Sequence, residues 1–345
     1  MKASAHKPIV AITVGDFNGI GPEVTLKSIR HPAVQKVCQP LLVGPAEVFL
    51  YYSEKLKLRL QFVPYDEAAS RKESKAILIL ESSLLSVDAI VPGELSKEAG
   101  RAAATAIEFG VQAVQTGIAH AIVTAPVSKQ ALHLADVNFP GQTEMVQHLS
   151  GSARVAMMLV SETMRVGLVT IHIPISGVAE MISRHLLREQ IEIIYEALRA
   201  DWKIRSPKLA VLGLNPHASE GGDIGSEDLT VVLPVVKEFQ QQRIRIEGPF
   251  PADSFFGKYK TGMYDAIVAM YHDQGLIPLK MSSFGKAVNI SAGLNIVRTS
   301  PDHGTAFDIA GKGIANPGSM IEAIKLAALV ATNRGLVRKT RRKKP

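Results

Sequence analysis

Cysteine is nearly absent from this 345-residue chain, which contains only Cys38. A single cysteine excludes an intramolecular disulfide and a zinc site built from several thiolates, and it is typical of a protein in a reducing cytoplasm. Any bound metal ion would therefore have to be held by histidines and carboxylates. We accordingly expect a cytoplasmic protein.

Long hydrophobic runs are also missing. No stretch approaches the roughly 18 uninterrupted apolar residues that a membrane-spanning helix requires. The apolar run before Gly15 is six residues long, which is too short for the core of a signal peptide. The sequence predicts a soluble protein that has no membrane partner.

The formal charge of +7 raises the question of a nucleic-acid partner. Six of the positive charges lie at the end of the chain, on Arg338, Lys339, Arg341, Arg342, Lys343 and Lys344. Subtracting six from seven leaves a charge of about +1 for all other residues. This basic tail has no interleaved aromatic residues, so we predict a solvated tail and no nucleic-acid binding. A mildly basic cleft for an anionic small molecule remains open.

Length and pattern predict a two-domain α/β protein. A chain of this length with 46% hydrophobic residues exceeds the size at which one core usually stops growing. Short, β-branched apolar runs predict strands at residues 8–14, 40–44, 75–80, 120–126, 166–174, 208–216 and 264–271. Helical spacing predicts long helices over 96–117 and 186–202. Strands that are apolar throughout indicate a sheet covered on both faces. We expect a first domain made of residues 1–140 and 294–345, and a second made of residues 141–293.

Polar clusters follow four of the predicted strands. They contain Asp16 and Asn18, His172, Asn215 and His217, and His272 and Asp273. In open α/β sheets, ligands bind at the carboxyl ends of the strands, so these side chains are candidates for one or more sites.

Three of these strand-end residues are His172, His217 and His272. Three neutral imidazoles that leave a position for water or substrate would make a catalytic metal site. The separations along the chain match no local metal-binding motif, and the alternative is that each histidine only caps a strand or bonds to a loop. Asp273 would either orient His272 or act as a structural cap.

Two further features are ambiguous on their own. The segment "GDFNGIGPEV" lacks the Lys-Ser/Thr of a phosphate loop and the spacing of a dinucleotide fingerprint, so it is either a structural turn or a binding loop. Pro22 would begin a helix there, with Glu23 beside its positive end. Lys280, Asn289 and Arg298 recur about nine residues apart behind His272. They would suit a phosphate or carboxylate, unless they are scattered surface residues.

Several long motifs together resemble one family. They are "GIGPE", "TAPVSK", "FPGQTE", "GLNPHASEGG", "YDAIVAMYHDQGLIPLK" and "RTSPDHGTAFDIAGKG", and they extend from about Ile9 to Ala328. This combination resembles the 4-hydroxythreonine-4-phosphate dehydrogenases of pyridoxal phosphate biosynthesis. The resemblance implies a two-domain α/β/α fold of the isocitrate/isopropylmalate dehydrogenase kind, with the active site in the interdomain cleft. It also implies that NAD is bound without the usual glycine fingerprint.

The resemblance assigns roles to individual residues. It implies that a divalent ion, zinc, magnesium or cobalt, is bound by His172, His217 and His272. It places the phosphorylated substrate against Gln142, Thr143, Lys280, Asn289 and Arg298. The NAD loop would contain His303, Gly304, Asp308 and Asn316. Proximity to family motifs makes Lys129 and Asp253 candidates for the general base. The family also implies a homodimer whose active site is shared between subunits.

The resemblance predicts oxidation of 4-phosphooxy-L-threonine at its 3-hydroxyl, followed by decarboxylation to 3-amino-2-oxopropyl phosphate. One position departs, because the family has histidine where this chain has Gln142. Glutamine forms hydrogen bonds but cannot carry a charge near neutral pH. Dehydrogenases of 4-phospho-D-threonate or 4-phospho-D-erythronate are therefore the alternative. A three-histidine metal hydrolase and a phosphate acyltransferase are more distant alternatives.

Overall fold

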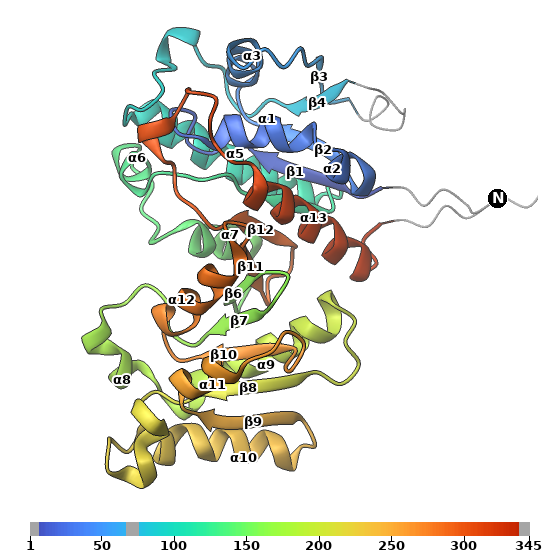
Figure 1. The fold of residues 1–345 in the computed structure, drawn as a ribbon. Coiled ribbons are helices and arrows are strands. Elements are labelled where there is room, and N and C mark those ends of the chain that lie inside the picture. Colours follow the sequence, from blue (N-terminus) through green and yellow to red (C-terminus); the bar gives the residue numbers. More distant parts are fainter. Residues whose placement is uncertain (1–6, 67–75, 338–345) are drawn as a thin grey trace, which may run out of the picture. The chain divides into compact units, whose positions relative to one another are not determined.

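The structure is a computed structural model that describes residues 7–66 and 76–337 (Figure 1). The basic tail lies outside the described residues, so its solvated state and the absence of a nucleic-acid partner stay predictions. Contacts divide the chain into two compact units, Met1–Ser152 with Leu294–Pro345, and Ala153–Gly293. The predicted division after residue 140 differs from this one in its placement of helix α7 (Gln142–Ser150), which here belongs to the first unit.

The first unit contains a parallel sheet with the strand order β3-β4-β2-β1-β5-β12. Its strands are β1 (Ile9–Thr13), β2 (Gln39–Val43), β3 (Phe62–Pro64), β4 (Ile77–Leu80), β5 (Ala121–Val123) and β12 (Arg298–Pro301). Its helices are α1 (Gly21–Ile29), α2 (Pro32–Val37), α3 (Ala46–Lys55), α5 (Lys97–Gln115), α6 (Lys129–Leu134), α7 and α13 (Gly318–Asn333), with short turns η1 (Val87–Ala89) and η5 (Phe307–Ile309). Strands β1 and β5 are buried at all but one residue, and β2 is buried over Leu41–Val43, which explains why their sequences are mostly apolar.

The second unit contains a mixed sheet with the order β11-β6-β7-β10-β8-β9, in which β6 pairs antiparallel with β7 and β11. Its strands are β6 (Ala156–Val160), β7 (Arg165–Leu168), β8 (Lys208–Leu212), β9 (Arg245–Phe250), β10 (Ala266–Ala269) and β11 (Val288–Ala292). Its helices are α8 (Val178–Met181), α9 (Arg184–Asp201), α10 (Leu233–Gln241), α11 (Ala252–Lys258) and α12 (His272–Ser283), with short turns η2 (Ile175–Gly177), η3 (Pro216–Gly222) and η4 (Asp228–Val232). Strands β7, β10, β8 and β9 are parallel neighbours, so their carboxyl ends meet at one edge.

The prediction of an α/β fold is confirmed, and each of the seven predicted strands overlaps a strand of the structure. The two predicted long helices are α5 and α9, and each begins behind a serine cap, Ser96 and Ser183. In the described part of the chain, no helix combines the length and the apolar character needed to cross a membrane.

The sequence pattern missed β3, β6, β9, β11 and β12. The clearest case is β12, whose four residues Arg298–Pro301 are all buried although the strand reads as polar. Arginine, threonine and serine can be buried in a strand when their polar atoms are hydrogen-bonded, and that condition depends on neighbours that are distant in the sequence.

Candidate active site

The three strand-end histidines follow three neighbouring parallel strands of the second unit. His172 comes four residues after the end of β7, His272 begins α12 shortly after β10, and His217 lies in η3 behind β8. The strand order is β7-β10-β8, so His272 follows the middle strand. We call this part of the second unit, with its three histidines, the histidine edge.

Polar side chains fix the spacing of these strand ends. The Thr170 hydroxyl donates to the Met270 carbonyl at 2.7 Å, which connects the end of β7 to that of β10. Gln274 connects β10 to β8, because its Oε1 accepts from the Met270 N–H at 2.7 Å and its Nε2 donates to the Gly213 carbonyl at 2.6 Å. The roles of Thr170 and Gln274 were not predictable from the sequence. Their only signal was their position beside His172 and His272.

The rings of His172 and His272 lie side by side, with centroids 5.9 Å apart and planes at 44°. A metal–nitrogen bond is about 2 Å long, so two imidazoles on one ion would have centroids about 5–6.5 Å apart. The donor type and the separation of this pair therefore fit a shared divalent ion. Within residues 7–66 and 76–337, no group of three or more histidine, cysteine, aspartate or glutamate side chains is close enough to hold a metal ion. The predicted three-histidine site stays a prediction.

Asp273 contacts the neighbouring ring. Its Oδ1 lies 2.7 Å from His272 Nδ1, which leaves Nε2 as the ring nitrogen that could face a ligand. The Asp273 side chain is 71% exposed, so water screens this contact and it orients the ring more than it stabilises the fold.

Other predicted residues of the second unit are more dispersed. Lys280 is exposed on α12, eight residues after His272, or about 12 Å along the helix axis. Asn289 lies in β11, and its Oδ1 is buried without a hydrogen-bond partner in the described structure. Asp253 is exposed in the first turn of α11, a helix that packs on η3.

In the first unit, the buried guanidinium of Arg298 contacts two of the other predicted substrate-binding residues, Gln142 and Thr143. Arg298 is only 2% exposed, and its Nη1 donates to Thr143 Oγ1 at 3.1 Å. Its Nη2 donates to Gln142 Oε1 at 3.1 Å and to Thr124 Oγ1 at 2.8 Å. Burial lowers the pKa of Arg298 to about 10, so it remains a cation at neutral pH. Lys129, at the start of α6, is exposed.

Gln142 is fixed at both ends of its amide. Its Nε2 donates to the Ala125 carbonyl at 3.2 Å, and its Oε1 accepts from Arg298. A neutral histidine could accept from the guanidinium, but a protonated one could not. The glutamine therefore keeps its place beside Arg298 independent of pH.

The end of β1 leads to Asp16, a fully buried carboxyl group. Its Oδ1 accepts from the Asn18 N–H at 3.0 Å, whereas Oδ2 has no hydrogen-bond partner among the described residues. Burial raises the pKa of Asp16 to about 6, because desolvation outweighs the backbone N–H groups that favour the anion.

Asp16 should make stability depend on pH. The folded protein ionises this group near pH 6 instead of 3.8, so its contribution to stability is present below pH 3.8 and is lost as the pH rises through 6. A pKa difference of roughly two corresponds to about 3 kcal/mol. We therefore expect Asp16→Asn to raise the free energy of unfolding by up to that amount at pH 8, with little gain at pH 4. Urea denaturation at both pH values measures this, with the exposed Asp88→Asn as control. Equal gains at both pH values would contradict it.

The "GDFNGIGPEV" segment, which the sequence left as either turn or binding loop, supports the predicted NAD loop. Buried Glu23 accepts from the Gly313 N–H at 3.2 Å and the Ala315 N–H at 2.8 Å. Lys27 pairs with Glu23 at 2.7 Å and donates to the carbonyls of the same two loop residues. The segment thus turns into helix α1, whose Glu23 and Lys27 shape the neighbouring loop.

The predicted NAD residues lie along that loop, between β12 and α13. His303 Nδ1 is 3.1 Å from the Gly304 carbonyl, and its Nε2 is buried without a hydrogen-bond partner in the described structure. Asp308 is exposed in η5. Asn316 accepts from the Gly318 N–H at 2.8 Å, so it organises the start of α13.

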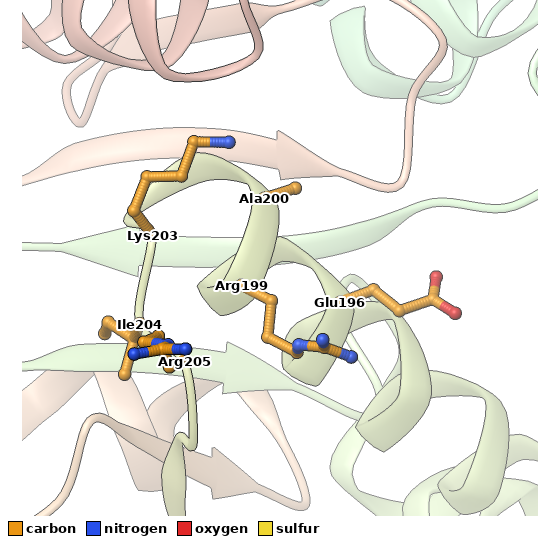
Figure 2. Close-up of a pocket in the computed structure, with 6 residues that line it drawn as sticks. All are labelled: Glu196, Arg199, Ala200, Lys203, Ile204 and Arg205. Atoms are coloured by element: carbon orange, nitrogen blue, oxygen red, sulfur yellow. The ribbon is translucent and has the colours of Figure 1, made fainter.

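A surface pocket elsewhere in the second unit contains none of these residues. It lies at the end of α9 and the turn that follows (Figure 2), and it is lined by Glu196, Arg199, Ala200, Lys203, Ile204 and Arg205. Cations at the carboxyl end of a helix complement its dipole, which accounts for their presence there.

Comparison with known proteins gives a consistent result. The family described as "Pyridoxal phosphate biosynthetic protein PdxA" matches residues 36–327. A 4-hydroxythreonine-4-phosphate dehydrogenase of Desulforapulum autotrophicum is 40% identical over 331 residues, which are 96% of this chain and 97% of that protein. A D-threonate 4-phosphate dehydrogenase of Cupriavidus necator is also 40% identical, over 96% of this chain and 99% of that protein. The crystal structure of a Klebsiella pneumoniae 4-hydroxythreonine-4-phosphate dehydrogenase is 36% identical, with a TM-score of 0.85 over 94% of this chain and 100% of that one.

The fold and these full-length relatives define the class, an α/β oxidoreductase of the dehydrogenase type. The chain belongs to the PdxA family. The resemblance found in the sequence motifs is thereby confirmed, and so is the prediction of a dehydrogenase. The metal hydrolase and the acyltransferase that the sequence left open are enzymes of other classes.

Proposed function

We propose that the chain is an NAD-dependent dehydrogenase that oxidises the 3-hydroxyl of 4-phosphooxy-L-threonine with help from a divalent metal ion. The resulting β-keto acid loses CO2 to give 3-amino-2-oxopropyl phosphate, a step of pyridoxine 5'-phosphate biosynthesis. The observation that carries the proposal is the position of His172, His217 and His272 behind three neighbouring parallel strands.

The metal ion belongs at the histidine edge. Zinc, magnesium or cobalt, when bound there, would supply Lewis-acid polarisation of the oxygen on carbon 3. Asp273, through its contact with His272 Nδ1, keeps the opposite ring nitrogen available as a ligand.

The oxidation requires hydride transfer and proton transfer. NAD, when bound, would accept the hydride from carbon 3, and the loop with His303, Gly304, Asp308 and Asn316 would hold its adenosine side. The hydroxyl proton goes to a base, for which Lys129 and Asp253 are the candidates.

Arg298 is the main anion-binding group in this proposal. Its guanidinium is already oriented by Thr124, Thr143 and Gln142, so it loses little freedom when it binds an anionic group of the substrate. Lys280 and Asn289 would complete the substrate contacts. The buried, unsatisfied Oδ1 of Asn289 is an acceptor suited to a substrate hydroxyl or ammonium group.

We also propose a homodimer with an active site shared between subunits. Helix α12, which begins at His272, exposes Ile277 (57%), Met281 (74%) and, at its end, Phe284 (87%). Side chains three to four residues apart lie along one side of a helix, so this stripe is suited to burial against a second copy. Sedimentation of the wild-type protein as a monomer would contradict the dimer.

The experiment must distinguish the substrates, because two relatives of 40% identity are named for different ones. The experiment measures the rate at which reduced nicotinamide forms when NAD is mixed with 4-phosphooxy-L-threonine, 4-phospho-D-threonate or 4-phospho-D-erythronate. It compares the wild type with Gln142→His. We expect the highest kcat/KM with the first substrate.

The Gln142→His variant distinguishes two explanations for the glutamine at this position. If the histidine variant has a higher kcat/KM only for 4-phosphooxy-L-threonine, Gln142 is a tolerated difference from the family. If the histidine variant has a lower kcat/KM for the substrate that the wild type prefers, Gln142 belongs to a different substrate specificity. If the wild type prefers 4-phospho-D-threonate or 4-phospho-D-erythronate, the proposal applies to that substrate instead. If none of the three compounds yields reduced nicotinamide, the proposal is overturned.

A further inference from the structure

His217 lies in an unusual stretch of backbone. Six successive residues have positive φ angles, namely His217 (52°), Ala218 (51°), Ser219 (69°), Glu220 (41°), Gly221 (71°) and Gly222 (111°). Residues with a β-carbon visit this left-handed region rarely, and normally as single residues. Four of the six are not glycine, so the surrounding structure must impose this conformation.

A buried carboxylate provides the constraint. Asp228, in η4, is fully buried, and its Oδ1 accepts from the Leu214 N–H at 2.6 Å. Its Oδ2 accepts from the Asn215 N–H at 3.0 Å and from the Ser219 hydroxyl at 2.8 Å. One carboxylate therefore holds the residues before the left-handed stretch and Ser219 within it.

Two neighbouring side chains complete this arrangement. Asn215 Nδ2 donates to Ser219 Oγ at 3.1 Å and to Glu227 Oε2 at 2.8 Å. The side chain of Ser219 is fully buried, and no large apolar side chain of the stretch anchors it. The conformation of this stretch thus depends on polar contacts that converge on Asp228.

We propose that Asp228 is a positioning residue, which through Ser219 and Asn215 holds His217 in place to bind the divalent ion. This inference rests on the proposed metal site. It differs from a general role in folding, because the hydrogen bonds of Asp228 go to the segment that carries His217 and leads out of β8. Without the carboxylate, the stretch would relax toward ordinary backbone angles and move the imidazole.

The test is titration of the metal-free, full-length protein with Co²⁺, whose visible absorption reports the ligands around the ion. We compare wild type, Asp228→Asn, Ser219→Ala and His217→Ala. Loss of a residue that orients a metal ligand typically costs 10–100-fold in affinity. We therefore expect Asp228→Asn to weaken Co²⁺ binding 10–100-fold and to change the spectrum, with a smaller loss for Ser219→Ala.

A matched control lies at the opposite end of the same strand. Asp265 Oδ2 accepts from the Lys208 N–H at 2.7 Å, where β8 begins. Asp265→Asn removes a comparable bond between a carboxylate and the backbone, so we expect a lower melting temperature with unchanged Co²⁺ affinity.

The outcomes are distinguishable. Wild-type affinity in Asp228→Asn, with weak binding in His217→Ala, would overturn the inference and leave the metal site intact. Wild-type protein that binds no Co²⁺, or binds it equally without His217, would overturn both. If Asp228→Asn does not fold, Ser219→Ala decides, and an unchanged affinity and spectrum in that variant would overturn the inference.

Discussion

Replacing His272 by alanine is expected to lower kcat/KM for the phosphorylated substrate by about 10³-fold. His272 follows the middle strand of the histidine edge, and its ring lies beside that of His172. In the proposed metal site, its loss therefore removes one of the three imidazole ligands. Lewis-acid stabilisation of developing charge is worth several kcal/mol, and about 4 kcal/mol corresponds to 10³ in rate.

Steady-state kinetics with added divalent metal measures this effect. His185→Ala is the matched control, because His185 is an exposed histidine of the same unit that lies within helix α9 and not at the end of a strand. We expect the control to keep wild-type kcat/KM, and a chelator to reduce the wild type to the level of His272→Ala. A His272→Ala variant within about threefold of wild type, still sensitive to chelator, would remove His272 from the metal site.

The histidine edge was predictable because it depends on a local rule. An apolar run that stops at a polar cluster identifies the end of a buried strand, and parallel strands bring such ends to one edge. The adjacency of β7, β10 and β8 was not predictable, because strand order is set by packing between segments distant along the chain. For the same reason, the roles of Thr170 and Gln274 were not predictable, since their partners Met270 and Gly213 belong to neighbouring strand ends.

The environments of the predicted anion-binding residues, unlike the strand-end positions of the histidines, could not be predicted from the sequence. The sequence treated Lys280 and Arg298 alike, as cations in one evenly spaced series, but Lys280 is exposed on a helix and Arg298 is almost fully buried. Burial of a guanidinium requires acceptors in place around it. These are Thr124, Thr143 and Gln142, which lie more than 150 residues earlier in the chain. No local pattern could have indicated that environment.

That environment leads to the second large expected effect. We expect Arg298→Lys to lower kcat/KM by 10²–10³-fold, mainly through a higher KM for the phosphorylated substrate. Lysine keeps the charge but is a compact donor without the planar fork, so it cannot contact Thr124, Thr143 and Gln142 together and still face an anion. Losing a buried, hydrogen-bonded charge contact costs about 2–5 kcal/mol, and the expected loss lies in the middle of that range.

Arg334→Lys is the matched control, since Arg334 is a half-buried arginine of the same unit whose Nη1 donates to the carbonyls of Leu294 and Ile296. It should lose some thermal stability and keep its KM. The decisive readout is stabilisation by substrate, because a ligand raises the melting temperature only of a protein that binds it. Arg298→Lys should lose that increase and Arg334→Lys should keep it. If Arg298→Lys melts at a lower temperature yet keeps both its KM and the increase with substrate, the buried guanidinium holds β5, β12 and α7 together and does not bind the anion.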